Sequence, residues 1–183
     1  MKKISISRRY ARALLLLGKE DGQAEKYREE LGKVSSLVSS QPEFGQVIDN
    51  PLYDTAKRRR ILSTVIESLN LSKMMSSFLM LLFDKGRFGF LSDVNDFYNK
   101  LADEVKGIAR ASLTSATDLS SETIEKIRNA LTRKTGKSVI LEVTKDPSLI
   151  GGIVTRIGDL VLDGSIKTQL LNMRETLKRG EGV

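Results

Sequence analysis

The feature that most constrains the fold is a change of hydrophobic period near Lys106 and Gly107. Before this point, apolar residues recur at i, i+3, i+4 and i+7, the spacing of one face of an α-helix. After it, short β-branched runs are interleaved with helical patterns. A chain of 183 residues can hold two small domains. We therefore predict a mainly α protein, with an N-terminal six-helix bundle in residues 1–106 and a small α+β domain in residues 107–183.

Two helices of the predicted bundle carry apolar residues on more than one face. The main apolar stripe of the first helix is Tyr10, Ala13, Leu14 and Leu17, and Ala11 and Leu15 lie on another face of it. The fifth helix carries Met75, Phe78, Leu79, Leu82 and Phe83. Ser72 is placed to cap the start of the fifth helix, and Gly86 to end it. Ordinary bundle core explains this pattern. A groove that receives another amphipathic helix explains it as well.

The C-terminal part has the element order β-α-β-β-β-α. The predicted strands are Ile108–Ala116, Ser138–Thr144, Ile153–Ile157 and Leu160–Asp163. Gly158-Asp159 between the last two strands indicates a two-residue hairpin. Ser120 and Ser165 are predicted to cap the two helices, and Gly136 to end the first of them. We expect the final helix to turn its apolar residues inward, namely Ile166, Leu170, Met173 and Leu177.

The composition argues against an enzyme. The chain has no histidine and no cysteine, which excludes a Ser-His-Asp triad, a thiol nucleophile and every His- or Cys-ligated metal site. We expect no catalytic residue, no cofactor and no metal. The longest apolar stretch, Phe78–Phe83, is far shorter than the roughly 20 residues that span a bilayer, so we expect a soluble protein.

Three stretches could be taken for binding or catalytic motifs, but ordinary secondary structure explains each of them. Thr135–Ser138 reads TGKS, but a phosphate loop needs a strand before it and a helix after it, the reverse of the order here. Lys57–Arg60 reads KRRR, and four consecutive helical residues fan out too widely to share one face. A solvated helix surface explains that run, with contact to an acidic partner or to lipid headgroups as the alternative. Asp159 and Asp163 could be read as a pair of catalytic carboxylates. A Gly-Asp turn explains the first, and an Asp-Gly helix entry explains the second.

The net charge of +7 leaves a second function open. A basic nucleic-acid-binding protein would need a clustered basic face or exposed aromatic side chains for stacking. The basic residues are spread along the chain, and aromatic residues make up only 5% of it. This alternative is therefore less well supported than a structural or helix-binding role.

Four stretches resemble one protein family, the delta subunit of the F-type proton-translocating ATP synthase, called the oligomycin-sensitivity-conferring subunit in mitochondria. They are RRYARALLLL (Arg8–Leu17), NPLYDTAKRRRIL (Asn50–Leu62), LLFDKGRFGFL (Leu81–Leu91) and DPSLIGGIVTRIGDLVLDGSIKTQL (Asp146–Leu170). The last is the most specific, because it combines Ile-Gly-Gly, a Gly-Asp turn and Asp-Gly-Ser at the family's spacing.

The resemblance implies a non-catalytic stator subunit of the peripheral stalk. It would link the N-terminal helix of an alpha subunit, in the catalytic head, to the membrane-anchored b subunits, and so resist rotor torque. It would lie peripherally on the cytoplasmic face of the bacterial inner membrane, or on the matrix or stroma side in an organelle. The resemblance places a groove for the alpha-subunit helix at Tyr10, Ala13, Leu14, Leu17, Leu79, Leu82 and Phe83. It places the b-subunit side at Ile150, Asp163, Gly164 and Leu170.

Overall fold

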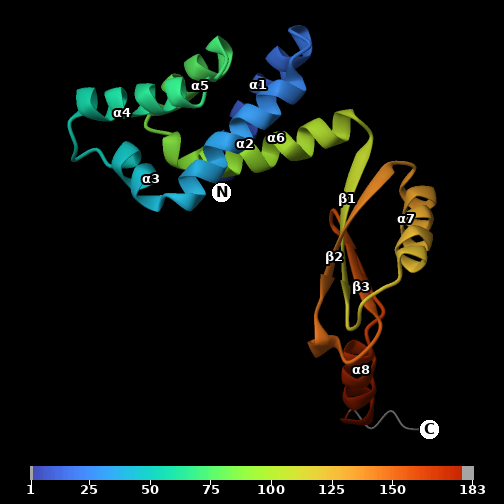
Figure 1. Cartoon of the computed structure of the whole chain (residues 1–183). Coiled ribbons are helices and arrows are strands. Elements are labelled where there is room, and N and C mark those ends of the chain that lie inside the picture. The colour runs from blue at the N-terminus through green and yellow to red at the C-terminus, as the bar shows by residue number, and fades with distance from the viewer. Residues whose placement is uncertain (1, 179–183) are drawn as a thin grey trace. The chain divides into compact units, whose positions relative to one another are not determined.

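The protein is mainly helical and carries one small sheet, which confirms the predicted fold class at that level. A computed structural model describes residues 2–178, and the chain divides into two compact units between Ala102 and Asp103. The first unit is helical (Figure 1). Its helices are α1 (Lys2–Glu20), α2 (Ala24–Ser40), α3 (Pro42–Asp49), α4 (Thr55–Ser68), α5 (Lys73–Asp84), a 3₁₀ turn η1 (Phe88–Phe90) and the start of α6 (Leu91–Val105).

Local capping chemistry sets the ends of α5. The Ser72 hydroxyl accepts a hydrogen bond of 3.3 Å from the backbone N–H of Met75. Glu30 of α2, itself buried, accepts two further bonds from Ser72, at 3.0 Å from its N–H and 2.7 Å from its hydroxyl. Past the other end, Gly86 has a φ of +60°, a conformation that glycine adopts without strain. Both predicted ends are confirmed.

Buried aliphatic and aromatic side chains from every helix of the first unit form one core. Two tyrosines tie it to polar partners: Tyr98 donates 2.7 Å to the carbonyl of Ala24, and Tyr27 donates 2.7 Å to Asp21. Burial raises the pKa of Tyr98 to about 12, and the hydrogen bond to Asp21 raises that of Tyr27 to about 12. Both phenols therefore stay protonated at neutral pH.

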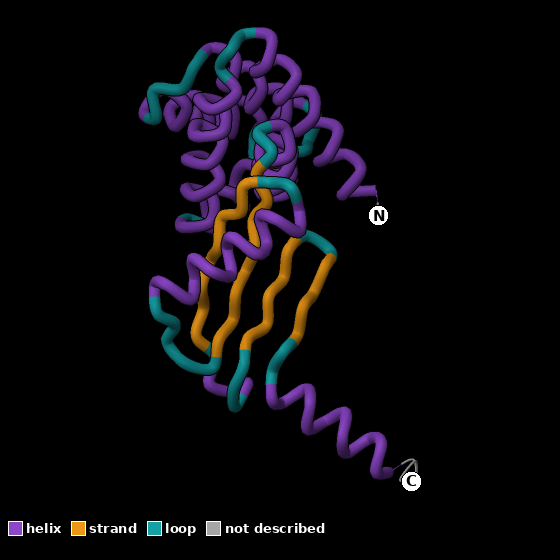
Figure 2. Tube along the Cα trace, turned by 90° about the vertical axis from the view of Figure 1, so that its right-hand side faces the viewer, coloured by secondary structure: helices purple, strands orange, loops and turns teal. Residues whose placement is uncertain are grey.

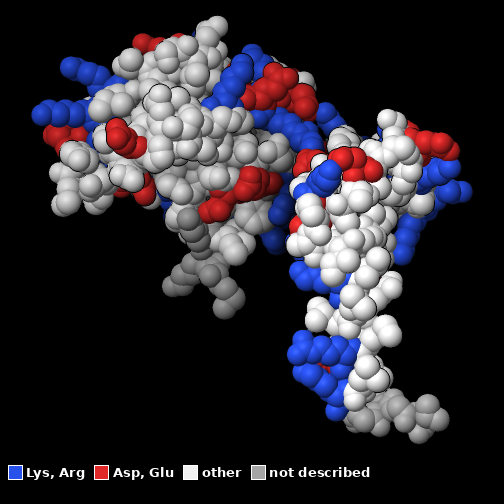
Figure 3. Space-filling view, turned by 60° about the horizontal axis from the view of Figure 1, so that its bottom comes forward, with Lys and Arg blue, Asp and Glu red and all other residues white. Residues whose placement is uncertain are grey.

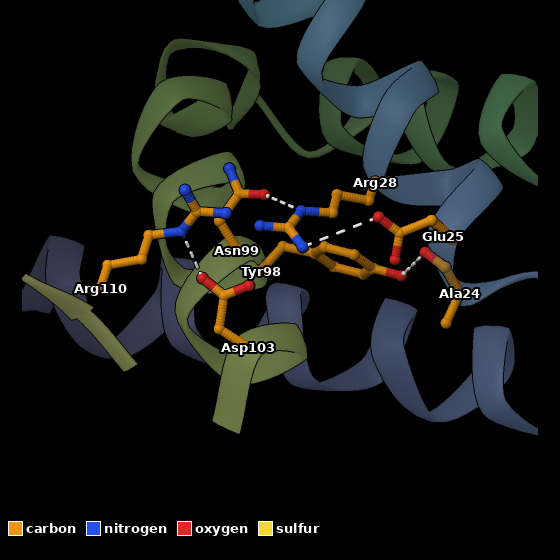
Figure 4. Close-up of polar contacts among 7 residues, drawn as sticks. All are labelled: Ala24, Glu25, Arg28, Tyr98, Asn99, Asp103 and Arg110. Atoms are coloured by element: carbon orange, nitrogen blue, oxygen red, sulfur yellow. Dashed lines mark hydrogen bonds and ion pairs between the residues drawn. The ribbon is translucent and has the colours of Figure 1, made fainter. Parts of the chain in front are cut away.

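Polar side chains also join α2 to α6. The Nε of Arg28 donates 2.7 Å to the side-chain oxygen of Asn99, and its guanidinium lies 3.7 Å from Glu25 (Figure 4). Further along α6, in the second unit, Asp103 accepts a 2.6 Å hydrogen bond from Arg110 (Figure 4).

The Lys57–Arg60 run lies near the start of α4. Three of its four side chains are exposed, as expected for a solvated helix surface.

The second unit holds a four-stranded sheet and the helices α7 and α8, as Figure 2 shows. Its elements are β1 (Ile108–Ser115), α7 (Ser121–Thr135), β2 (Ser138–Lys145), a 3₁₀ turn η2 (Pro147–Leu149), β3 (Ile153–Ile157), β4 (Leu160–Asp163) and α8 (Ile166–Lys178). The strand order is β2-β1-β3-β4, with β1 and β2 parallel and the other pairs antiparallel. The predicted element order is confirmed, and so is the hairpin at Gly158-Asp159, because Ile157 pairs with Leu160.

Helix α7 packs on the sheet, and the core of the second unit lies between them. Leu131 of α7 is buried with Ala111, Val139 and Ile157 from three strands. The predicted caps hold here too. The Ser120 hydroxyl accepts from the N–H of Thr123, and Gly136 at a φ of +67° ends the helix. Thr135–Ser138 is therefore a helix end and a strand start, as the sequence indicated.

The prediction that α8 turns its apolar side inward is wrong. No residue of α8 is buried, and the helix runs on beyond the end of the sheet (Figures 1 and 2). Ile166, Leu170, Met173 and Leu177 are all exposed. A helical period shows that an apolar face exists, but it does not show that the same chain covers that face.

Candidate functional site

The seven residues predicted for the alpha-subunit groove lie on α1 and α5, but the structure divides them into two layers. Leu14, Leu79, Leu82 and Phe83 belong to the core of the first unit and are buried. In this structure they contact other helices of the chain and do not reach its surface. Tyr10 is half-buried, Ala13 is exposed, and Leu17 is 37% exposed. Only these three could touch a partner directly.

Tyr10 joins α1 to α5. Its ring lies 6.1 Å from that of Phe78, edge to face, a favoured arrangement for aromatic pairs. Its hydroxyl accepts a 2.6 Å hydrogen bond from Arg87, which follows α5. The two helices therefore meet along the side of α1 that carries Tyr10.

Sequence reasoning missed the rest of the surface along this line. On α1, Ile6 continues the stripe of Tyr10, Ala13 and Leu17 with helical spacing. On α5, Met74 and Leu81 flank Phe78 at i−4 and i+3. Met74 is half-buried and Leu81 is 44% exposed. We call this surface the α1–α5 seam, formed by Ile6, Tyr10, Ala13, Leu17, Met74, Phe78 and Leu81. The same spacing rule could have found its added members.

Three of the four residues predicted for the b-subunit side lie at the base of α8 or just before it. Asp163 accepts hydrogen bonds from the backbone N–H of Ser165 at 2.9 Å and from the hydroxyl of Thr168 at 2.8 Å. These hydrogen bonds, and most of all the one from the backbone N–H of Ser165, hold the pKa of Asp163 below its usual range. The Ser165 hydroxyl in turn accepts from the N–H of Thr168 at 3.2 Å, which confirms the predicted cap. Asp163 thus fixes where α8 begins.

Gly164 and Ile150 shape the chain around this cap. A Cβ added to Gly152 would overlap the carbonyl oxygen of Gly164, so the two backbones approach as closely as glycine permits. Ile150 follows η2 with a φ of +66° and is 65% exposed. A β-branched residue seldom adopts this left-handed conformation.

Leu170, the fourth predicted residue, lies on α8 itself. With Ile166, Met173 and Leu177 it forms an exposed stripe, which we call the α8 stripe. Beside it is an open hollow of about 450 Å³, lined by Leu170, Met173, Arg174, Leu177 and Lys178. Asp163 and Gly164 therefore lie at the start of α8, and Leu170 lies exposed on its surface.

Both surfaces are made mainly of apolar side chains. No group of three or more acidic residues that could hold a metal ion occurs within residues 2–178. In the same part of the chain, no helix is long and apolar enough to cross a membrane. Each unit thus has an apolar helical surface with exposed side chains, the α1–α5 seam in the first and the α8 stripe in the second.

Residues 6–177 match the family model of the ATP synthase delta (OSCP) subunit. The chain belongs to this family. A delta subunit from Desulfatibacillum aliphaticivorans is 60% identical over 183 residues, with all of both chains covered. One from Geobacter metallireducens is 41% identical over 176 residues, covering 96% of this chain and 98% of that one.

The fold of the delta family is also seen in a solved structure. A chain in the cryo-EM structure of the Toxoplasma gondii mitochondrial ATP synthase hexamer matches with a TM-score of 0.70 at 21% identity, covering 93% of this chain and 96% of that one. As a delta (OSCP) protein, the chain is a non-catalytic stator subunit of the F-type ATP synthase. These relatives give no support to the nucleic-acid-binding alternative.

Proposed function

We propose that this delta-family subunit connects the N-terminal helix of an alpha subunit to the b subunits of the peripheral stalk, and so keeps the catalytic head from turning with the rotor. The observation that carries the proposal is that each unit has an apolar helical surface with exposed side chains, the α1–α5 seam in one and the α8 stripe in the other. A tether needs two sites. Once one is engaged, binding at the other becomes effectively intramolecular and each contact can be modest.

The seam is the proposed site for the alpha-subunit helix, presented by the first six helices acting as one bundle. Leu17 and Leu81 would be its aliphatic anchors, each contributing roughly 1.5–3 kcal/mol when fully buried. Ala13 is small enough to let a guest helix approach closely. Beneath this surface Leu14, Leu79, Leu82 and Phe83 form a well-packed support, so the guest helix would meet a firm surface.

The α8 stripe is the proposed site for the b subunits. Leu170 would make direct contact, while Asp163 and Gly164 hold the base of the helix. Ile150 would add an exposed apolar side chain held in a fixed conformation. The subunit would reach the membrane only through the complex, on the cytoplasmic face in a bacterium or the matrix or stroma side in an organelle.

Calorimetry with the N-terminal alpha-subunit peptide of the same synthase tests the first site. Leu17→Asp and Leu81→Asp should each weaken binding at least about tenfold, because each puts a charge where apolar surface must be buried. Leu16→Asp is the matched control, since Leu16 is 53% exposed but points about 100° away from Leu17 around α1. If all three variants bind alike, the seam is not the site.

A further inference from the structure

The two edges of the α8 stripe differ in charge. Successive helical residues are 100° apart, so Ile166, Leu170, Met173 and Leu177 fall within an arc of about 60°. Basic residues follow along one edge of this arc, namely Lys167, Arg174 and Lys178. The opposite edge carries the uncharged residues Gln169 and Thr176. We call these the basic edge and the neutral edge.

The basic edge adjoins the apolar stripe in the structure as well as on the helical projection. Arg174 and Lys178 line the same hollow as Leu170, Met173 and Leu177. Figure 3 shows Lys and Arg side chains gathered on one side of the lower end of the molecule, next to uncharged side chains. Whatever covers the stripe will therefore lie beside these positive charges.

Little within α8 offsets this charge. Glu175 is the one acidic residue between Ile166 and Lys178, and it lies 4.0 Å from Lys178 with both side chains more than half exposed. Exposed pairs of this kind are weak. A partner that brings carboxylates to the basic edge would gain favourable interactions there.

We propose that α8 binds an amphipathic helix whose apolar face is bordered by Asp or Glu along one edge only, and that the basic edge fixes the orientation of that helix. This inference rests on the proposed function, in which a b subunit occupies the α8 stripe. What it adds is the feature by which α8 selects its partner helix, namely acidic residues along one edge of the apolar face.

The charges disfavour two other occupants. A second copy that docked through its own α8 would bring the same basic edge and, within Ile166–Lys178, only Glu175 as an acidic group, so that helix lacks complementary charge. A membrane-surface helix gains by having basic residues on both sides of its apolar face, where both sides meet anionic headgroups. Here one edge is neutral.

The test measures binding of the full-length chain to the soluble segment of the b subunits from the same synthase. One variant neutralises the basic edge, Arg174→Gln with Lys178→Gln. Its matched control adds acid to the neutral edge, Gln169→Glu with Thr176→Glu, and lowers the net charge by the same amount. We expect the first to weaken binding about tenfold at low salt and the second less than about twofold. The wild-type affinity should fall with added salt, and that dependence should shrink in the first variant.

Leu170→Asp separates this inference from the proposed function. If the b segment fails to bind, or binds Leu170→Asp as well as wild type, the stripe is not its site and both fall. If Leu170→Asp abolishes binding but the two charge variants bind alike, the one-edged partner is wrong while b-subunit binding stands. Dimerisation of the free chain that Leu170→Asp removes, or retention on phosphatidylglycerol vesicles, would also overturn the inference.

Discussion

Arg87 donates a hydrogen bond of 2.6 Å to the hydroxyl of Tyr10, which lies 77 residues earlier in the chain. The guanidinium carbon of Arg87 also lies 5.5 Å from the centre of the Tyr10 ring, within the range of a cation–π interaction. One side chain therefore holds the turn after α5 against the middle of α1. The geometry of the α1–α5 seam depends on this pair.

Tyr10→Phe keeps the ring and removes the acceptor. We expect the free energy of unfolding to fall by about 1 kcal/mol, the usual net value of such a bond. Arg87→Ala should cost more, about 1–2 kcal/mol, because it removes the cation–π contact as well. Urea denaturation followed by circular dichroism measures both. Arg9→Ala, an exposed arginine on the same helix, is the control, and an equal loss there would show that the pair is not special.

Gly152→Ala should destabilise the second unit by about 3 kcal/mol. Its Cβ would collide with the Gly164 carbonyl, and its φ of +80° is unfavourable for alanine. Gly158→Ala is the matched control, since Gly158 also has a positive φ but an added Cβ would meet nothing within 4 Å. It should cost only about 1 kcal/mol. Equal losses in urea melts would mean that the close backbone approach contributes little.

Ile150→Gly should separate stability from binding. Glycine relieves the strain of a β-branched residue at a φ of +66°, so we expect stability to rise by up to about 1 kcal/mol. If Ile150 contacts the b subunits, affinity for the b segment should fall in the same variant. Asn70→Gly provides the comparison, because Asn70 also has a positive φ but asparagine tolerates it. A loss of stability in Ile150→Gly would contradict the strain assignment.

Acid should loosen the start of α8 through Asp163. Its hydrogen bonds to Ser165 and Thr168 lower its folded-state pKa, while in the unfolded chain the pKa returns to about 3.9. The stabilisation is complete above the unfolded value and is lost as the pH falls through the lower folded value. Between about pH 5 and pH 3, Asp163→Asn should flatten the decline of the thermal midpoint. A flat wild-type profile of the thermal midpoint over this pH range would refute the assignment.

Features governed by local chemistry could be predicted from the sequence. Ser72, Ser120 and Ser165 cap helices because a serine hydroxyl satisfies the free N–H groups of a first turn. Gly136 ends α7 because glycine accepts a positive φ. These outcomes depend on a few neighbouring residues, so no knowledge of tertiary structure was needed.

Whether another part of the chain covers an apolar helix face could not be predicted from the sequence. Leu14 and Leu17 are both apolar on one helix, yet the first is buried and the second is exposed. Periodicity identifies their stripe but not the depth of each member. The same limit explains the error at α8, whose apolar side looks like core in the sequence. Ile150 gives no sequence signal of its left-handed backbone, because isoleucine disfavours it.

A helix of 13 residues that buries no side chain in its own chain has little tertiary support. Its apolar side chains stay exposed to water in the free chain. Under the function proposed above, free molecules should therefore aggregate more readily, and be cleaved more readily by proteases at α8, than molecules in which a b subunit covers this helix.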